Sequence, residues 1–235
     1  MAGHSKWANI KHKKERADAK KGKEFSRCAK EIISSVKEGG PDQKANARLR
    51  LAVQKAKAAN VPNEVIDRNI KKASSADQAD YFEMTYELYG HGGVGIIVDI
   101  MTDNKNRISS DIRIATNKRG GTVANQGAVS FNFDRKGILQ IDKSAGPEET
   151  LFEKALEAGA EDFDSTDDAY IVITAPDELY QVLDNLDIPC ENPSLEMIPK
   201  TLVEVDDETR EKNDALIEWL ESIDDVDATY HNMSE

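Results

Sequence analysis

The stretch GHGGVGIIVDIM, residues 90–101, decides between two fold classes. Its glycines match the G-x-G-x-x-G spacing of a dinucleotide-binding loop, which lies between a strand and a helix. The residues that follow, 96–101, form a short apolar run rich in β-branched side chains, and this pattern is typical of a buried strand. We therefore interpret the glycines as the turn of a hairpin whose first strand is Tyr81–Leu88, and we reject a dinucleotide site.

The segments after this hairpin predict one further helix and one further strand. Apolar residues at helical spacing indicate a helix over Asn106–Lys118, which Gly120 and Gly121 end. Apolar and polar residues then alternate over Val129–Phe133, which predicts a half-buried strand. Residues 80–133 thus read as β-β-α-β and need further elements to close a sheet.

The next segment, residues 134–199, reads as β-α-β-β-α-β, which is the ferredoxin-like order. Its predicted elements are strands at Ile138–Ile141, around Phe163, at Tyr170–Thr174 and at Ser194–Ile198, with helices at 147–158 and Asp177–Asn185. The remaining residues predict a strand at Leu202–Val205, a helix at Glu208–Ser222 and a strand at Ala228–His231. These last elements can complete the sheet begun in residues 80–133, which makes residues 134–199 an insertion.

The N-terminal residues predict a small bundle of three amphipathic helices. The first carries an apolar face from Phe25 to Val36, and Gly39-Gly40-Pro41 ends it. The second spans 43–59 with Ala45 at the start of its inner face, and the third begins at Pro62. The predicted fold class is therefore α+β: a helical domain (1–79), an α/β domain (80–133 with 200–235) and an inserted ferredoxin-like domain (134–199).

Charge is distributed very unevenly along the chain. Residues 1–72 contain 19 Lys+Arg and 8 Asp+Glu, whereas residues 73–235 contain 12 Lys+Arg and 36 Asp+Glu. The two parts therefore carry net charges of +11 and −24. This asymmetry is typical of a polyanion-binding arm on an acidic body.

The candidate nucleic-acid-binding residues lie in the arm and on the second helix. They are Lys6, Lys11, Lys13, Lys14, Arg16, Lys20, Lys21, Lys23, Arg48, Arg50, Lys55 and Lys57. Arg48 and Lys55 are seven residues apart, as are Arg50 and Lys57, so each pair shares a helix face. We expect few acidic partners for these cations, which favours a nucleic acid over an acidic protein or an anionic membrane. Trp7 is a candidate for base stacking or for docking the arm onto the bundle.

Other function classes find little support in the sequence. No apolar run is long enough to cross a membrane, and we expect neither a secretory signal nor a small-molecule substrate. Cys28 and Cys190 read as reduced structural thiols of a cytoplasmic protein. The acidic run Asp224–Asp227 lacks calcium-loop spacing, so we interpret it as a solvated turn and expect no metal, no cofactor and no enzymatic activity.

Four motifs resemble the YebC/PmpR-type family, which includes the mitochondrial translational activator of cytochrome oxidase. They are MAGHSKWANIKHKK at residues 1–14, NARLRLAVQKAKAANVP at 46–62, TDNKNR at 102–107 and KRGGTV at 118–123. The resemblance runs over essentially the whole chain and implies a helical domain followed by two ferredoxin-like domains. It also implies a non-enzymatic protein of the kind labelled DNA-binding transcriptional regulator, with ribosome-associated translation factors among its members.

The chain departs from the family pattern at three positions. The family often has Gly and Pro where this chain has Leu88 and His91, and Gly where it has Asn125. We expect these departures to alter two loops and leave the fold unchanged. Three targets remain open: duplex DNA, ribosomal RNA or the ribosome, and an acidic protein. The amino-acid pattern of the N-terminal helices favours phosphate binding over base reading.

Overall fold

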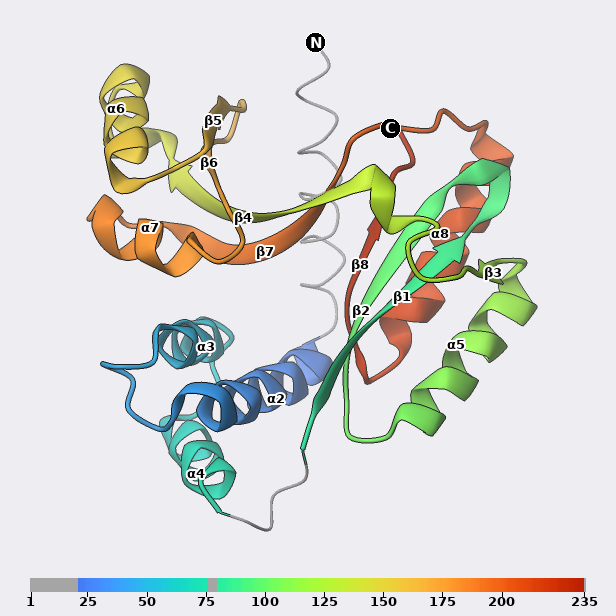
Figure 1. The fold of residues 1–235 in the computed structure, drawn as a ribbon, viewed down its shortest axis with the longest axis horizontal. Helices are drawn as coiled ribbons and strands as arrows, with labels where there is room; N and C mark the ends of the chain where they lie inside the picture. The colour runs from blue at the N-terminus through green and yellow to red at the C-terminus, as the bar shows by residue number, and fades with distance from the viewer. Residues whose placement is uncertain (1–20, 76–79, 235) are drawn as a thin grey trace. The chain divides into compact units, whose positions relative to one another are not determined.

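The computed structural model describes residues 21–75 and 80–234, and they form a mixed α/β fold (Figure 1). This part of the chain contains seven α-helices and two four-stranded sheets. Residues 134–198 make one compact unit, and the described residues up to Phe133 together with those from Pro199 make another. The division into three domains stays a prediction.

Three helices open the described chain: α2 (Lys21–Gly39), α3 (Ala47–Ala58) and α4 (Asn63–Ala73). Their shared core contains Ile32, Leu49 and Ile66, each at most 2% exposed. Asn46 fixes the start of α3, because its side chain accepts a hydrogen bond from the Leu49 N–H. Two residues that were predicted to lie on apolar helix faces are exposed. They are Phe25, near the start of α2, and Ala45, which precedes α3.

The first sheet has the strand order β3-β1-β2-β8. Its strands are β1 (Phe82–Tyr89), β2 (Gly95–Thr102), β3 (Thr122–Val123) and β8 (Val226–His231). The antiparallel β1–β2 pair runs from Phe82 opposite Thr102 to Tyr89 opposite Gly95, so the glycine-rich stretch is a hairpin turn as predicted. A strand and not a helix follows the glycines, which confirms that this stretch is not a dinucleotide-binding loop.

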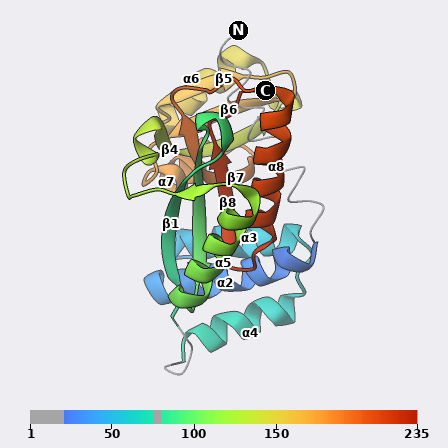
Figure 2. The same ribbon diagram turned by 90° about the vertical axis from the view of Figure 1, so that its right-hand side faces the viewer.

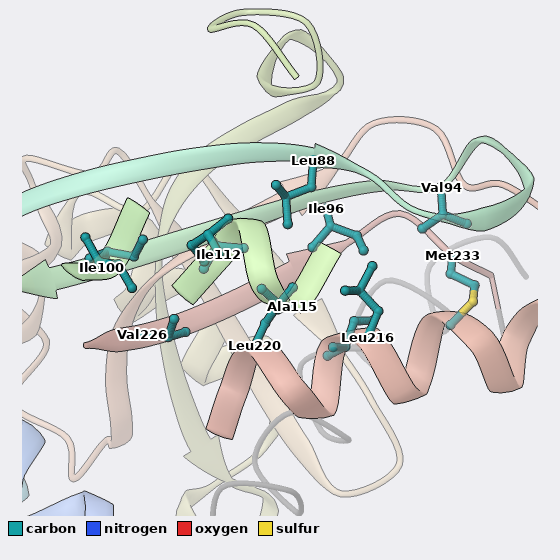
Figure 3. Packing of buried hydrophobic residues seen from close by; sticks show 13 residues of the cluster. Leu88, Val94, Ile96, Ile100, Ile112, Ala115, Leu216, Leu220, Val226 and Met233 are labelled. Carbon is teal, nitrogen blue, oxygen red and sulfur yellow. The ribbon is translucent and has the colours of Figure 1, made fainter. Parts of the chain in front are cut away.

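Two helices, α5 (Lys105–Arg119) and α8 (Asp207–Ser222), cover one face of this sheet. Their inner side chains meet those of β1, β2 and β8 in a single apolar cluster (Figure 3). Within it Leu88, Ile96, Ile112 and Leu216 are completely buried. This core holds α5 and α8 side by side on the sheet.

The second sheet has the strand order β5-β6-β4-β7. Its strands are β4 (Phe133–Asp142), β5 (Asp162–Ser165), β6 (Ala169–Thr174) and β7 (Glu191–Pro199). Helices α6 (Glu148–Ala158) and α7 (Leu179–Leu186) pack on it through Leu151, Ala155 and Val182. Two further apolar residues of α6, Phe152 and Leu156, are 41% and 46% exposed.

Two predicted strands are absent from the described chain. Residues 129–133 turn through a short 3-10 helix, η2 (Ser130–Asn132), because the Val129 and Ser130 N–H groups donate to the Glu87 carboxylate and not to a strand. Residues 202–205 make a single bridge, between Val203 and Met233. The alternating pattern was therefore correct about the burial of Val129 and Phe133, but wrong about the backbone and about Phe131, which is 71% exposed.

Candidate nucleic-acid interface

The structure describes only part of the predicted interface. Lys6, Lys11, Lys13, Lys14, Arg16, Lys20 and Trp7 lie outside the described residues. Lys21 and Lys23 belong to the first turns of α2, for which the backbone alone is described. The four remaining candidates, Arg48, Arg50, Lys55 and Lys57, all lie on α3.

Helix α3 separates these four cations into two rows. The row of Arg48 and Lys55 faces neighbouring elements and is held in ion pairs. Arg48 binds both Glu38 of α2 and Glu83 of β1, and the Lys55 Nζ atom lies 3.3 Å from Glu31 Oε1. The second row, Arg50 and Lys57, lies on the opposite side of the helix, and Lys57 is exposed.

The ion pairs of α3 correct one expectation from the sequence. Burial by itself would lower the pKa of Arg48, and its hydrogen bonds to Glu83 and Glu38 raise that pKa above its ordinary value. Acidic partners are therefore not scarce around the described cations. They come from other elements, which the spacing along one helix does not reveal.

A second group of cations surrounds a buried carboxylate between α2 and the first sheet. Asp225 is 4% exposed. Lys30 of α2 approaches its Oδ1 atom to 2.8 Å, and Arg107 of α5 approaches its Oδ2 atom to 2.6 Å. Thr102 donates to the same Oδ2 at 2.9 Å. Lys30 also donates to the backbone oxygen of Asp224 at 3.0 Å.

The Asp225 cluster shows that some cations of the chain stabilise the folded protein through ion pairs. Burial by itself would raise the pKa of Asp225, but hydrogen bonds from Lys30, Arg107 and Thr102 hold it below the ordinary value. The acidic run was expected to be solvated, and for Asp225 that expectation is wrong. Among the residues that the structure describes, no three His, Cys, Asp or Glu side chains are placed to hold a metal ion.

The family departures fall at structurally defined positions. Leu88 lies inside β1 and is completely buried, so the expectation that it belongs to a loop is wrong. The His91 ring lies 2.7 Å from the backbone oxygen of Arg119, at the end of α5. Asn213 of α8 fixes the same turn, since its Oδ1 accepts from the His91 N–H at 2.8 Å. The backbone oxygen of Asn125 accepts a hydrogen bond from the Ala128 N–H in the loop before η2.

The two cysteines are free thiols, as expected. Cys28 is buried in the core of the three helices, and Cys190 is half-buried. Burial raises the pKa of the Cys190 thiol to about 11. A thiol with such a pKa is a poor nucleophile near neutral pH.

The fold and the charge pattern define a mixed α/β protein with a basic helical N-terminal segment. Residues 5–76 match the model of the TACO1/YebC protein N-terminal domain, and residues 81–233 match that of the TACO1/YebC second and third domain. The chain therefore belongs to the TACO1/YebC family.

Curated relatives and a solved structure agree with this assignment. A probable transcriptional regulatory protein of Protochlamydia amoebophila is 71% identical over 99% of this chain and 96% of its own length. One from Chlamydia pneumoniae is 58% identical, with both chains covered completely. The crystal structure of a conserved hypothetical protein from Aquifex aeolicus matches with a TM-score of 0.81 and 40% identity, covering 92% of this chain and 91% of that one.

Proposed function

We propose that this protein is a non-enzymatic, DNA-binding regulator of transcription that acts in the cytoplasm. The observation that carries the proposal is the contrast between +11 in residues 1–72 and −24 in residues 73–235. Clustered cations on an acidic molecule favour a polyanionic partner and orient it towards one end of the chain. The names of the relatives, probable transcriptional regulatory proteins, support DNA as that partner.

The proposed contact residues divide into two groups. The arm supplies Lys6, Lys11, Lys13, Lys14, Arg16, Lys20, Lys21 and Lys23, with Trp7 beside them. On α3 the exposed Lys57 is the better phosphate-binding candidate, and the half-buried Arg50 shares its side of the helix. Arg48 and Lys55 already bind carboxylates, so a phosphate must compete with Glu83, Glu38 or Glu31 for them.

We also propose that residues 134–199 are an inserted ferredoxin-like domain. The order β4-α6-β5-β6-α7-β7 along the chain and β5-β6-β4-β7 across the sheet supports this. The first sheet has an equivalent layout, with β2 and β1 central and β3 and β8 at its edges. Its strands come from both sides of the inserted segment.

The alternative function is that of a ribosome-associated, RNA-binding translation factor. The Lys-rich arm is consistent with it, because a segment that binds phosphates without reading bases serves structured RNA as well as DNA. No membrane partner is proposed. No helix among the described residues is long and apolar enough to cross a bilayer.

The decisive experiment compares binding to promoter-length duplex DNA with co-sedimentation on ribosomes, across one salt series. Replacing Lys11, Lys14, Lys20 and Lys23 by Ala is expected to weaken duplex binding. It should also flatten the log–log salt slope by about 0.9 for each phosphate that the variant no longer neutralises. Replacing Lys154 on α6 by Ala is the control and should leave the slope unchanged.

Duplex binding that is insensitive to the four arm substitutions would contradict the proposal. Ribosome association that outlasts duplex binding at physiological salt would establish the alternative.

A further inference from the structure

Helix α5 is a basic element within the acidic body. It contains five of the 12 Lys and Arg residues found after residue 72, against one acidic residue, Asp111. Its net charge is therefore +4, whereas α8, which packs beside it, carries six acidic and two basic residues. In Figure 2 the side that carries these two helices faces the viewer.

The outward face of α5 carries a row of hydrogen-bonding side chains, with the apolar Ile114, 50% exposed, beside it. Ile108, Ile112, Ala115 and Thr116 are buried against the sheet and α8. The exposed positions opposite them are Asn106, Ser110, Arg113 and Asn117. Their spacing of four, three and four residues places them on one line along the helix.

Three of these side chains have no bonding partner within the part of the chain that the structure describes: Asn106, Arg113 and Asn117. Ser110 donates its hydroxyl to the backbone oxygen of Asn106 at 3.0 Å. The other basic residues of the helix are different. Arg107 is bound to Asp103 and Asp225, Lys105 lies over the Phe82 ring, and Arg119 lies over the Trp219 ring.

The chemistry of this row fits the edges of base pairs. Arg pairs with guanine and Asn with adenine through two hydrogen bonds each, in a major groove wide enough for an α-helix. Acidic α8 beside α5 repels phosphates, so a duplex that binds this face must keep its backbone away from α8. None of these four outward positions is acidic, although residues 73–235 carry a net charge of −24.

We propose that the outward face of α5 enters the major groove of duplex DNA and supplies base discrimination, with Asn106, Arg113 and Asn117 as the reading residues. The inference rests on the proposed function and deepens it. The arm supplies phosphate affinity that is blind to sequence, and α5 adds preference for particular base pairs.

The test begins with selection of duplexes from a random-sequence library by the full-length wild-type protein. Affinities for the selected duplex and a scrambled one are then measured for wild type and for Arg113→Ala/Asn117→Ala. The matched control, Lys154→Ala/Gln181→Ala, removes one cation and one amide from exposed positions of α6 and α7. Arg113→Lys keeps the charge and removes the two-pronged hydrogen bond.

We expect the preference for the selected duplex to fall about 10-fold or more in the α5 double variant, since each two-pronged pair is worth roughly that factor. Arg113→Lys should lose part of the preference while keeping its affinity for the scrambled duplex. The control should keep both. Equal melting temperatures for wild type and variants confirm that folding is intact.

Several outcomes overturn the inference. If the wild type binds duplexes but enriches no motif, or if the variant loses affinity for both duplexes equally, α5 does not read bases and the proposed function still stands. If the wild type binds no duplex, the proposed function itself fails. A change in sedimentation coefficient in the variant identifies the face as an interface between copies. Loss of structured-RNA binding without loss of duplex binding identifies RNA as its ligand.

Discussion

Asp225 joins three segments that are far apart in the sequence. Its carboxylate binds Lys30 from α2 and Arg107 from α5, and it accepts from Thr102 at the end of β2. All three donors meet one carboxylate that is 4% exposed. Loss of its charge therefore leaves two cations without their shared partner.

The substitution Asp225→Asn is expected to lower the free energy of unfolding by about 3 kcal/mol, the lower end for breaking a buried pair, because Arg107 stays half-exposed. Chemical denaturation at pH 7 measures this. Asp227→Asn is the control, since that carboxylate is 52% exposed and pairs with Arg27 at 3.4 Å. It should change stability by less than about 1 kcal/mol.

The pH dependence gives the same prediction a second readout. The pKa of Asp225 is lower in the folded protein than the ordinary 3.8, so its stabilising contribution is fully present above that value. The contribution is lost as the pH falls through the lower folded pKa. The difference in stability between wild type and Asp225→Asn should therefore be constant near neutrality and shrink below about pH 4. A difference that persists unchanged in acid would contradict the role given to the charge.

The sequence singled out the segments that contain Arg107 and Asp225, without revealing that these residues pair with each other or that Lys30 joins them. TDNKNR and the acidic run at 224–227 both stand out as motifs. The pairing of Lys30 with Asp225 spans 195 positions, and no local spacing rule reaches that far. The same limit explains why Glu83 was missed as a partner of Arg48, which lies 35 positions away.

At the scale of elements, the end of α5 and the β1–β2 turn fit closely together. Gly120 ends the helix with φ +79°, and a Cβ atom there would lie 2.6 Å from His91 Cε1. The same ring lies 2.7 Å from the Arg119 backbone oxygen. Position 120 therefore requires glycine for two reasons: its φ angle is positive, and the His91 ring leaves no room for a Cβ atom.

Replacing Gly120 by Ala should lower the free energy of unfolding by about 2 kcal/mol, through left-handed backbone strain and the close approach to His91. Gly93→Ala isolates the first contribution, because Gly93 has φ +81° with open space around it. Adding His91→Ala to Gly120→Ala should recover part of the loss, and a double-mutant cycle measures that coupling. Purely additive effects would show that the ring does not restrain this position.

Local signals predicted most elements well. Gly120 and Gly159 end helices in left-handed conformations, and Pro147 precedes the first turn of α6, as their chemistry indicated. The segment at 129–133 was mispredicted because its amides bind Glu87, more than 40 residues earlier in the chain. The outward row of α5 was also missed, since which face of a helix is covered depends on the sheet and on α8.

At the scale of the whole molecule, the segment 134–198 leaves and rejoins the rest of the chain at one place. The Lys200 N–H donates to the Asn132 oxygen at 2.8 Å, and Asn132 donates through its side chain to the Thr201 oxygen at 3.0 Å. The residues that flank the two ends of the segment are thus hydrogen-bonded to each other. A short loop can replace everything between them.

Deleting residues 134–198 and joining the ends by a short Gly-rich loop is expected to leave a protein that unfolds cooperatively and still binds duplex DNA. Circular dichroism and a denaturant titration measure the first property, and the salt series measures the second. Deletion of 143–198 is the contrasting variant. It leaves β4 without its β6 partner and exposes Leu139 and Ile141, so it should aggregate. An unfolded 134–198 deletion would argue against an inserted domain.

The position of β8 also determines the order in which the molecule can be assembled during synthesis. Strand β2 pairs with β8, which follows the whole 134–198 segment in the chain. All four strands of the second sheet lie within 133–199, so that sheet can form as soon as those residues have left the ribosome. The first sheet must wait, with one edge of β2 unpaired, until α8 and β8 have been made. A nascent chain of this protein therefore finishes its later-encoded sheet before the one it began first.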